Sequence, residues 1–139
     1  MSIERKLAIS LLKLTKNGSA LIEAVNIDAR VPFEVSTELL EKLQDEDLIY
    51  LKSDSVEIDR EGRMKLAIKA ASLGAAVEQV SDLLRWQEFE EIAAYALKSN
   101  GYAVKNNARF THEGKRWEID VVGCKRPLVI CIDCKHWQR

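Results

Sequence analysis

The spacing of apolar residues in the first half of the chain predicts four helices and one small hairpin. Apolar side chains recur every three or four positions over residues 3–16, before Asn17 and Gly18 end the pattern. Ser19 is expected to cap a second helix through Val25, and Pro32 to open a third. Two short apolar segments, 48–51 and 56–58, flank a polar turn and predict a hairpin. The last element predicted in this half is a fourth helix over residues 62–73, capped by Asp59.

The second half is predicted to be a helix followed by three strands. Ser81 is expected to cap the helix, Phe89 to lie at the centre of its apolar stripe, and Gly101 to end it. The stripe also includes Trp86, Ile92, Ala93, Ala96 and Leu97. The predicted strands begin at Tyr102, cover residues 116–122 up to Gly123, and cover residues 128–135. The polar residues 106–114 are expected to form a loop between strands.

The composition is that of a globular chain, with 47% hydrophobic and 31% charged residues among 139. No apolar run reaches the roughly 18 residues that a membrane helix needs, and the N-terminus does not read as a leader, so no membrane association and a cytoplasmic location are expected. The three cysteines, Cys124, Cys131 and Cys134, form an odd set that fits reduced thiols. A zinc site with His136 is disfavoured, because strand alternation separates Cys131 from Cys134.

Charge divides the chain. Residues 1–80 carry 11 basic and 14 acidic side chains, a net charge of −3, and residues 81–139 carry 10 and 8, a net charge of +2, which together give the overall −1. This distribution excludes a global cationic field and makes the second half the better candidate for nucleic-acid binding.

The order of three helices, a hairpin and a fourth helix resembles a winged helix-turn-helix domain, expected over residues 1–78, and residues 38–49 resemble that family's third helix running into its wing. A third helix that reads DNA carries Arg, Lys, Asn or Gln toward the groove, whereas this one is acidic, which favours a packing or protein-contact module. The basic residues near the fourth helix are expected to lie on a solvated face. They are Arg60, Arg63, Lys65 and Lys69.

Charged residues interrupt the apolar strands of the second half. Asp133 and Lys135 share one face of the third predicted strand, and Asp120 lies within the apolar second strand. Burial of such charges costs several kcal/mol unless they are paired or serve a metal and substrate. Two carboxylates on adjacent strands with an amine nearby are what Mg²⁺ and a phosphodiester require, so the residue types point to phosphoryl hydrolysis.

Residues 86–137 resemble the PD-(D/E)XK nuclease superfamily, most closely its Mrr-like restriction endonucleases and archaeal Holliday-junction resolvases. The resemblance rests on three segments, which are Phe89-Glu90-Glu91, Glu118-Ile119-Asp120-Val121-Val122-Gly123 and Cys131-Ile132-Asp133-Cys134-Lys135-His136-Trp137. It implies that Asp120 is the first motif aspartate, that Asp133 is the acidic residue of the second motif and that Lys135 is its lysine. The 13-residue step between the two aspartates has the length that these families use.

The family also uses a glutamate from the preceding helix, for which Glu88, Glu90 and Glu91 are available. Helical geometry places Glu91 opposite the apolar stripe and therefore in solvent, and Glu90 best matches the family position, with Glu88 in reserve. The resemblance then implies that Glu90, Asp120 and Asp133 hold Mg²⁺, for which Mn²⁺ can substitute. Lys135 would activate water, and the products would carry 5′-phosphate and 3′-hydroxyl ends.

Basic residues between the first two strands are candidates for holding phosphates, with a plain surface loop as the alternative. They are Lys105, Arg109, Lys115 and Arg116, joined by His112. Trp86 and Trp117 are expected to serve core or interdomain packing rather than base stacking, and Trp137 is left open.

The sequence thus predicts a two-domain α+β or α/β chain, with a winged helix-turn-helix domain over residues 1–78 and a restriction-endonuclease-like α-β-β-β core over residues 79–139. That core is expected to be incomplete, because the family continues after the lysine strand. A bare sheet favours a homodimer or higher oligomer. The leading hypothesis is a Mg²⁺-dependent DNA endonuclease, with RNA left open as a substrate. The alternative is a non-catalytic adaptor that binds DNA or protein and carries a degenerate nuclease core.

Overall fold

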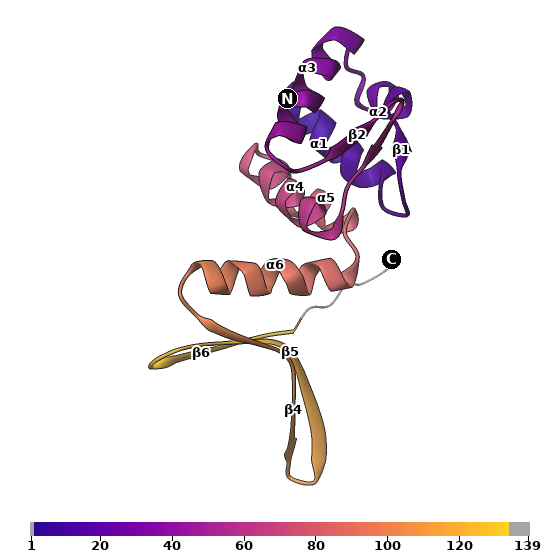
Figure 1. Cartoon of the computed structure of the whole chain (residues 1–139). Helices are drawn as coiled ribbons and strands as arrows, with labels where there is room; N and C mark the ends of the chain where they lie inside the picture. Colours follow the sequence, from indigo (N-terminus) through magenta and orange to yellow (C-terminus); the bar gives the residue numbers. More distant parts are fainter. Residues whose placement is uncertain (1, 134–139) are drawn as a thin grey trace. The chain divides into compact units, whose positions relative to one another are not determined.

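The computed structural model describes residues 2–133 and divides the chain into two compact units, residues 1–84 and residues 85–139. Figure 1 shows the elements of each unit, which among the described residues are six helices and two three-stranded antiparallel sheets. The fold is therefore mixed α and β. The domain boundary expected after residue 78 falls inside helix α5 (Val77–Asp82), which belongs to the first unit.

The first unit contains five helices and a sheet in the strand order β1-β3-β2. Its elements are α1 (Ile3–Leu14), β1 (Ala20–Leu21), α2 (Ile22–Ala29), α3 (Phe33–Asp45), β2 (Tyr50–Lys52), β3 (Ser55–Glu57), α4 (Arg60–Ser72) and α5. The predicted helical spacing of α1 is confirmed, because Leu7 and Leu11 are fully buried in the core together with Leu43 of α3 and Leu66 of α4. Each such side chain contributes roughly 1.5–3 kcal/mol by leaving water.

Two predictions about helix ends in this unit have opposite outcomes. Asp59 caps α4 as expected, since its Oδ1 accepts a hydrogen bond from the amide of Gly62 at 2.7 Å. The cap expected at Ser19 is wrong, because α2 begins at Ile22. The chain is extended just before this helix, where β1 pairs with β3, and that pairing takes the residues which the sequence pattern assigned to the helix.

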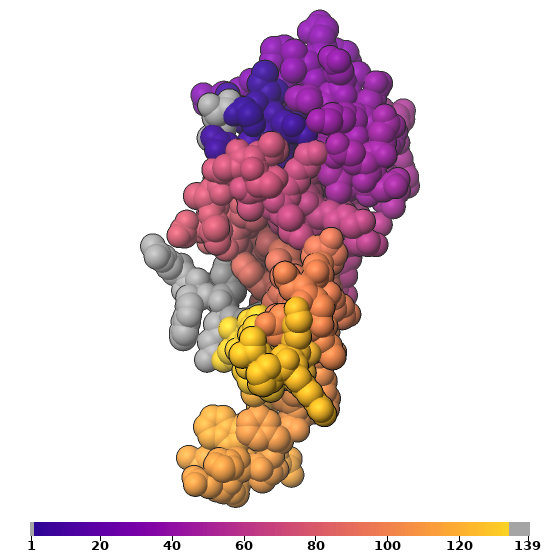
Figure 2. All heavy atoms as spheres, turned by 90° about the vertical axis from the view of Figure 1, so that its left-hand side faces the viewer, coloured from indigo at the N-terminus to yellow at the C-terminus, as the bar shows by residue number. Residues whose placement is uncertain are grey.

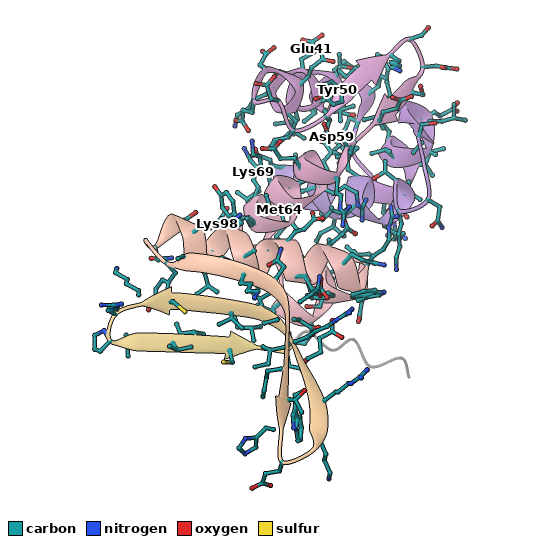
Figure 3. All side chains as sticks on the ribbon, turned by 60° about the horizontal axis from the view of Figure 1, so that its bottom comes forward. Glu41, Tyr50, Asp59, Met64, Lys69 and Lys98 are labelled. Carbon is teal, nitrogen blue, oxygen red and sulfur yellow. The ribbon has the colours of Figure 1, made fainter. Side chains whose placement is uncertain are left out.

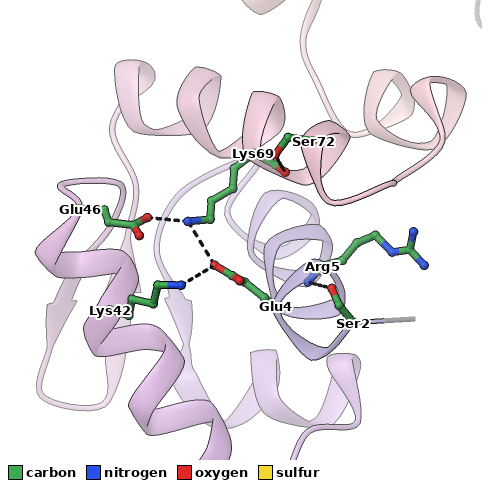
Figure 4. A network of polar contacts seen from close by, with 7 residues as sticks. All are labelled: Ser2, Glu4, Arg5, Lys42, Glu46, Lys69 and Ser72. Carbon is green, nitrogen blue, oxygen red and sulfur yellow. Dashed lines mark hydrogen bonds and ion pairs between the residues drawn. The ribbon is translucent and has the colours of Figure 1, made fainter.

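A polar network holds three helices of the first unit together (Figure 4). Lys69 of α4 contacts Glu4 of α1 at 3.1 Å and Glu46 at the end of α3 at 2.6 Å, and Lys42 of α3 also reaches Glu4 at 3.4 Å. Partial burial would raise the pKa of Glu4, but the hydrogen bonds and charges of the two lysines outweigh it and hold that pKa below its ordinary value. The ionised carboxylate of Glu4 and the two lysines therefore link these helices by ion pairs.

The predicted solvated face of α4 is wrong at Arg63, which is only 2% exposed. Its guanidinium lies inside the unit and donates hydrogen bonds to the carbonyls of Leu12 and Leu83 and to Oγ1 of Thr15. At the N-terminal end of the same helix, the hydroxyl of Tyr50 donates to Asp59 at 3.1 Å (Figure 3), and this hydrogen bond raises the pKa of the tyrosine.

The second unit consists of a helix and a three-stranded antiparallel sheet in the order β4-β5-β6, which confirms the predicted succession. Its elements are α6 (Trp86–Ser99), β4 (Ala103–His112), β5 (Lys115–Lys125) and β6 (Leu128–Ile132). Helix α6 lies along one face of the sheet (Figure 1), where Ala94 and Leu97 pack with Val121 of β5. This small core defines the inner face of the sheet.

Several predicted boundaries in this unit are wrong. Helix α6 begins after Arg85 rather than Ser81, because residues 77–82 form α5 instead. The expected loop over residues 106–114 is a strand and a tight turn, since β4 continues to His112 and pairs with β5 over residues 103–106 and 108–112. Strand β5 also continues past Gly123, whose missing side chain leaves room for Leu97, because an added Cβ would lie 2.9 Å from Cδ1 of that leucine.

Candidate functional site

Asp120 and Asp133 lie at the same end of the β5–β6 ladder. The last residue pair there is Val121 with Ile132. Asp120 directly precedes Val121, and Asp133 directly follows Ile132. One further step of this register sets the two aspartates directly opposite each other. Opposite residues of an antiparallel pair project from the same face with Cβ atoms roughly 5 Å apart. This register therefore predicts that two of the four residues expected at the catalytic site lie side by side.

Strand alternation places this carboxylate pair on the sheet face away from α6. Val121 faces the helix, so its neighbour Asp120 faces the other way. Asp120 is half-buried and Asp133 is exposed. The third predicted strand is therefore shorter than expected within the described part of the chain, since β6 ends at Ile132 and Asp133 follows it.

The backbone bends beside Asp120. Asn107 lies across from it on β4, between the pairs formed by Asn106 and Ala108, and has a φ of 52°, in the left-handed region. Asparagine tolerates this conformation better than most residues. The hairpin of β4 and β5 changes direction along its length in Figure 1, so its outer part extends away from the rest of the unit.

The three candidate glutamates of α6 have different environments. Glu88 is 4% exposed, and its Oε1 accepts a hydrogen bond from the amide of Arg85 at 2.9 Å, so it caps the helix. This role leaves Glu90 as the better catalytic candidate. Glu90 is half-buried, and its Oε1 is shielded from solvent. Glu91 is half-buried as well, so its expected position in open solvent is wrong.

The structure does not gather Glu90 with the aspartate pair. Within residues 2–133, no three or more His, Cys, Asp or Glu side chains come close enough together to hold one metal ion. The remaining predicted member, Lys135, lies outside the described residues, together with Cys134, His136 and Trp137. The donor set that is described, two carboxylates on adjacent strands, has the chemistry of a site for a hard divalent cation.

The four predicted phosphate-binding residues lie on the β4–β5 hairpin. Lys105 and Arg109 come from β4, Lys115 and Arg116 come from β5, and all four are exposed. Arg109 forms a long ion pair of 3.9 Å with Glu118 across the strands. The hairpin thus carries the predicted cations on a protruding arm rather than on a loop.

Two aromatic residues of this hairpin were assigned no binding role from the sequence. Phe110 and Trp117 are directly opposite each other, and are 46% and 50% exposed. Neither Trp117 nor Trp86, which is 52% exposed, lies in a core, so the expected core packing is wrong, and the interdomain packing stays a prediction. Strand alternation on both sides of Gly114 is the signal that could have predicted this pair.

Comparison with known proteins gives one finding. Residues 85–139 match the model of a protein family described as a nuclease-related domain, NERD. The match begins at the first residue of the second unit and supports a nuclease-like domain there. Searches of curated proteins and of solved structures returned no match.

A helix that spans a membrane must be both long and apolar. Over residues 2–133, none is both long and apolar enough to cross a bilayer.

Proposed function

We propose that the chain is a Mg²⁺-dependent endonuclease that hydrolyses phosphodiester bonds of DNA, with a PD-(D/E)XK-type site of the Mrr-like or junction-resolvase-like kind. The single observation that carries this proposal is that the β5–β6 ladder ends at the pair Val121–Ile132, with Asp120 and Asp133 at the next position of each chain segment, in a unit that matches a nuclease-related family. Mn²⁺ is expected to substitute for Mg²⁺, since both prefer oxygen ligands. RNA is the alternative substrate.

In this proposal Asp120 and Asp133 hold the cation, and Glu90 acts directly or through a water molecule. The bound cation supplies Lewis-acid stabilisation of the charge on the phosphate. Lys135 orients the attacking water and stabilises the same charge. Attack on phosphorus with loss of the 3′-oxygen leaves 5′-phosphate and 3′-hydroxyl ends.

The test is cleavage of supercoiled, linear and branched DNA in the presence of Mg²⁺ or Mn²⁺. We expect Asp120→Asn, Asp133→Asn and Lys135→Met to abolish cleavage, since each removes a charge at the site. The matched pair Glu90→Gln and Glu91→Gln separates the helix candidates, because only the first should lose activity. Equal cleavage by the wild type and the aspartate variants would contradict the mechanism.

We propose in addition that the first unit is a winged helix-turn-helix domain that contacts protein. The order of its helices and the strand order β1-β3-β2 support this fold. The exposed side of α3 is acidic and would repel DNA phosphates. A cavity of about 680 Å³ beside α3 is lined by apolar residues, Phe33 among them, and by the acidic residues Glu23, Glu41 and Asp54. These features favour a protein partner over DNA for this unit.

The same cavity supports the alternative function, a non-catalytic adaptor with a degenerate nuclease core. The adaptor hypothesis predicts no cleavage under any condition, and it predicts that Glu41→Lys, in the lining of this cavity, changes partner binding. Cleavage that depends on Asp133 would refute it.

We further propose a homodimer or higher oligomer that covers strand β6. This strand lies at an edge of the described sheet, and its Leu128 and Val129 are 57% and 63% exposed. Such an edge favours association. A monodisperse monomer in sedimentation measurements would contradict this proposal.

A further inference from the structure

The tip of the β4–β5 hairpin carries an exposed aromatic pair on one face. Phe110 and Trp117 are cross-strand partners, so their rings project from the same side, and about half of each side chain is in contact with solvent. Figure 2 shows the tip, in light orange, protruding from the rest of this unit. No packing requirement within the described unit accounts for two large rings at this position.

Charge surrounds the aromatic pair. Arg116 is the cross-strand partner of Thr111, and Lys115 that of His112, one step farther toward the turn. Neither Arg116 nor Lys115 forms an ion pair with a carboxylate among residues 2–133. A hollow of about 500 Å³ is bounded at the tip by basic, polar and aromatic side chains. They are Arg109, Phe110, Thr111, Arg116, Trp117 and Glu118.

We propose that this tip is a stacking platform for unpaired bases, and that the substrate of the nuclease site therefore contains a single-stranded segment. The inference rests on the proposed function and deepens it. Every base has a flat π face, and stacking on an aromatic side chain stabilises binding without sequence preference. Bases inside a duplex already stack on their neighbours, so they do not offer a face to the platform. Lys115, two positions from Trp117 and therefore on the same face of the hairpin, holds phosphate beside the stacked bases.

Trp117 and Trp86 provide a matched pair of variants. Both are half-exposed tryptophans of the second unit, but Trp86 is the first residue of α6 and lies outside the hairpin. Substitution of either by leucine keeps an apolar side chain and removes the aromatic face. A difference between the two variants therefore reports stacking at the hairpin rather than general apolar contact.

The experiment measures binding of a labelled oligothymidylate of about 16 nucleotides and of a duplex of equal length, on the full chain, with EDTA present. We expect the wild type to prefer the single strand. Trp117→Leu should weaken that binding by roughly 10-fold and duplex binding by less than about 2-fold. Trp86→Leu should change neither, and Trp117→Phe should restore most of the affinity. Lys115→Gln should weaken binding of both ligands, because it removes a phosphate contact.

Direct evidence for stacking comes from fluorescence. In a Trp86→Phe, Trp137→Phe background, Trp117 is the sole tryptophan, and its emission should be quenched by the single strand. Unchanged affinity of Trp117→Leu, equal binding of duplex and single strand, or no binding of oligothymidylate by the wild type would each overturn the inference.

Failure of the catalytic proposal gives a different result. Because EDTA prevents Mg²⁺-dependent cleavage, the binding results do not depend on activity. Stacking without cleavage would refute only the nuclease mechanism, whereas cleavage that is lost in Asp133→Asn and unaffected by Trp117→Leu would refute only the platform.

Discussion

Arg63 should be one of the most sensitive positions of the first unit. Its guanidinium donates through Nη1 to the carbonyl of Leu12 at 3.0 Å and to Oγ1 of Thr15 at 2.9 Å, and through Nη2 to the carbonyl of Leu83 at 3.0 Å. Leu12 lies in the last turn of α1 and Leu83 is the C-cap of α5. Carbonyls at helix ends lack partners within their own helix and carry partial negative charge, so a buried cation satisfies both needs.

The size of the effect follows from these contacts. Hydrogen bonds from a charged donor contribute about 1.5–3 kcal/mol each, but burial of the guanidinium offsets much of this. Arg63→Met keeps an apolar stem and also removes the buried charge, so the main cost is the loss of partners for three acceptors. We expect the free energy of unfolding to fall by about 3 kcal/mol. With a urea dependence of about 1.5 kcal/mol/M, the midpoint moves down by about 2 M.

The chain provides separate probes for its two units. All three tryptophans follow residue 85, whereas α1 to α5 belong to the first unit. Circular dichroism at the helical band therefore reports mainly the first unit, and tryptophan fluorescence reports the second. Arg63→Met should shift the dichroism midpoint and leave the fluorescence midpoint in place.

Arg60→Met is the matched control for this prediction. Arg60 is the first residue of α4 and is exposed, so its loss should change the stability by less than about 0.5 kcal/mol. If the dichroism midpoints of the two variants agreed, the buried guanidinium would not have the role assigned to it.

Three further predictions concern stability and use the same two probes. Lys69→Met should lower the free energy of unfolding of the first unit at neutral pH. This loss relative to the wild type should shrink as the pH falls below about 4.5, because the lowered pKa of Glu4 means that the stabilisation from its ionised carboxylate is lost on protonation. A loss that stayed constant down to pH 2 would contradict this. Asp59→Ala removes the cap on the Gly62 amide and should cost about 1 kcal/mol by dichroism, whereas Asp59→Asn should cost less. Gly123→Val places a side chain against α6 and should cost about 1–3 kcal/mol, seen in the fluorescence transition only.

Helical periodicity predicted most of the first unit because burial there follows the sequence pattern closely. The apolar positions of α1 are buried, and Asp59 caps α4, since both depend on local spacing. The position of α2 could not be predicted in this way. The residues just before α2 pair with β3, more than thirty positions later in the sequence. This long-range strand pairing overrides the local preference of Ser19 for a helix N-cap.

Composition misled the predictions at Arg63 and over residues 106–114. A basic residue on a helix is most often solvated, and only the positions of α1 and α5 show that two helix ends converge on Arg63. The stretch 106–114 is polar, yet an exposed two-stranded arm needs no buried face, so polarity did not exclude a strand. Its register was set by the turn at Gly114, which has a φ of 77°.

The turn between β5 and β6 explains why the spacing of the two aspartates along the sequence matters. Lys125 pairs with Leu128, so only two residues lie in that turn. Across a two-residue turn, residues that lie opposite each other are always an odd number of positions apart. Asp120 and Asp133 are 13 positions apart and equally distant from the turn, so they meet this condition. A step of 12 or 14 would have set the carboxylates on opposite faces, where they could not share a cation. The sequence therefore contained the pairing of the carboxylates, but the length of the turn was needed to see it.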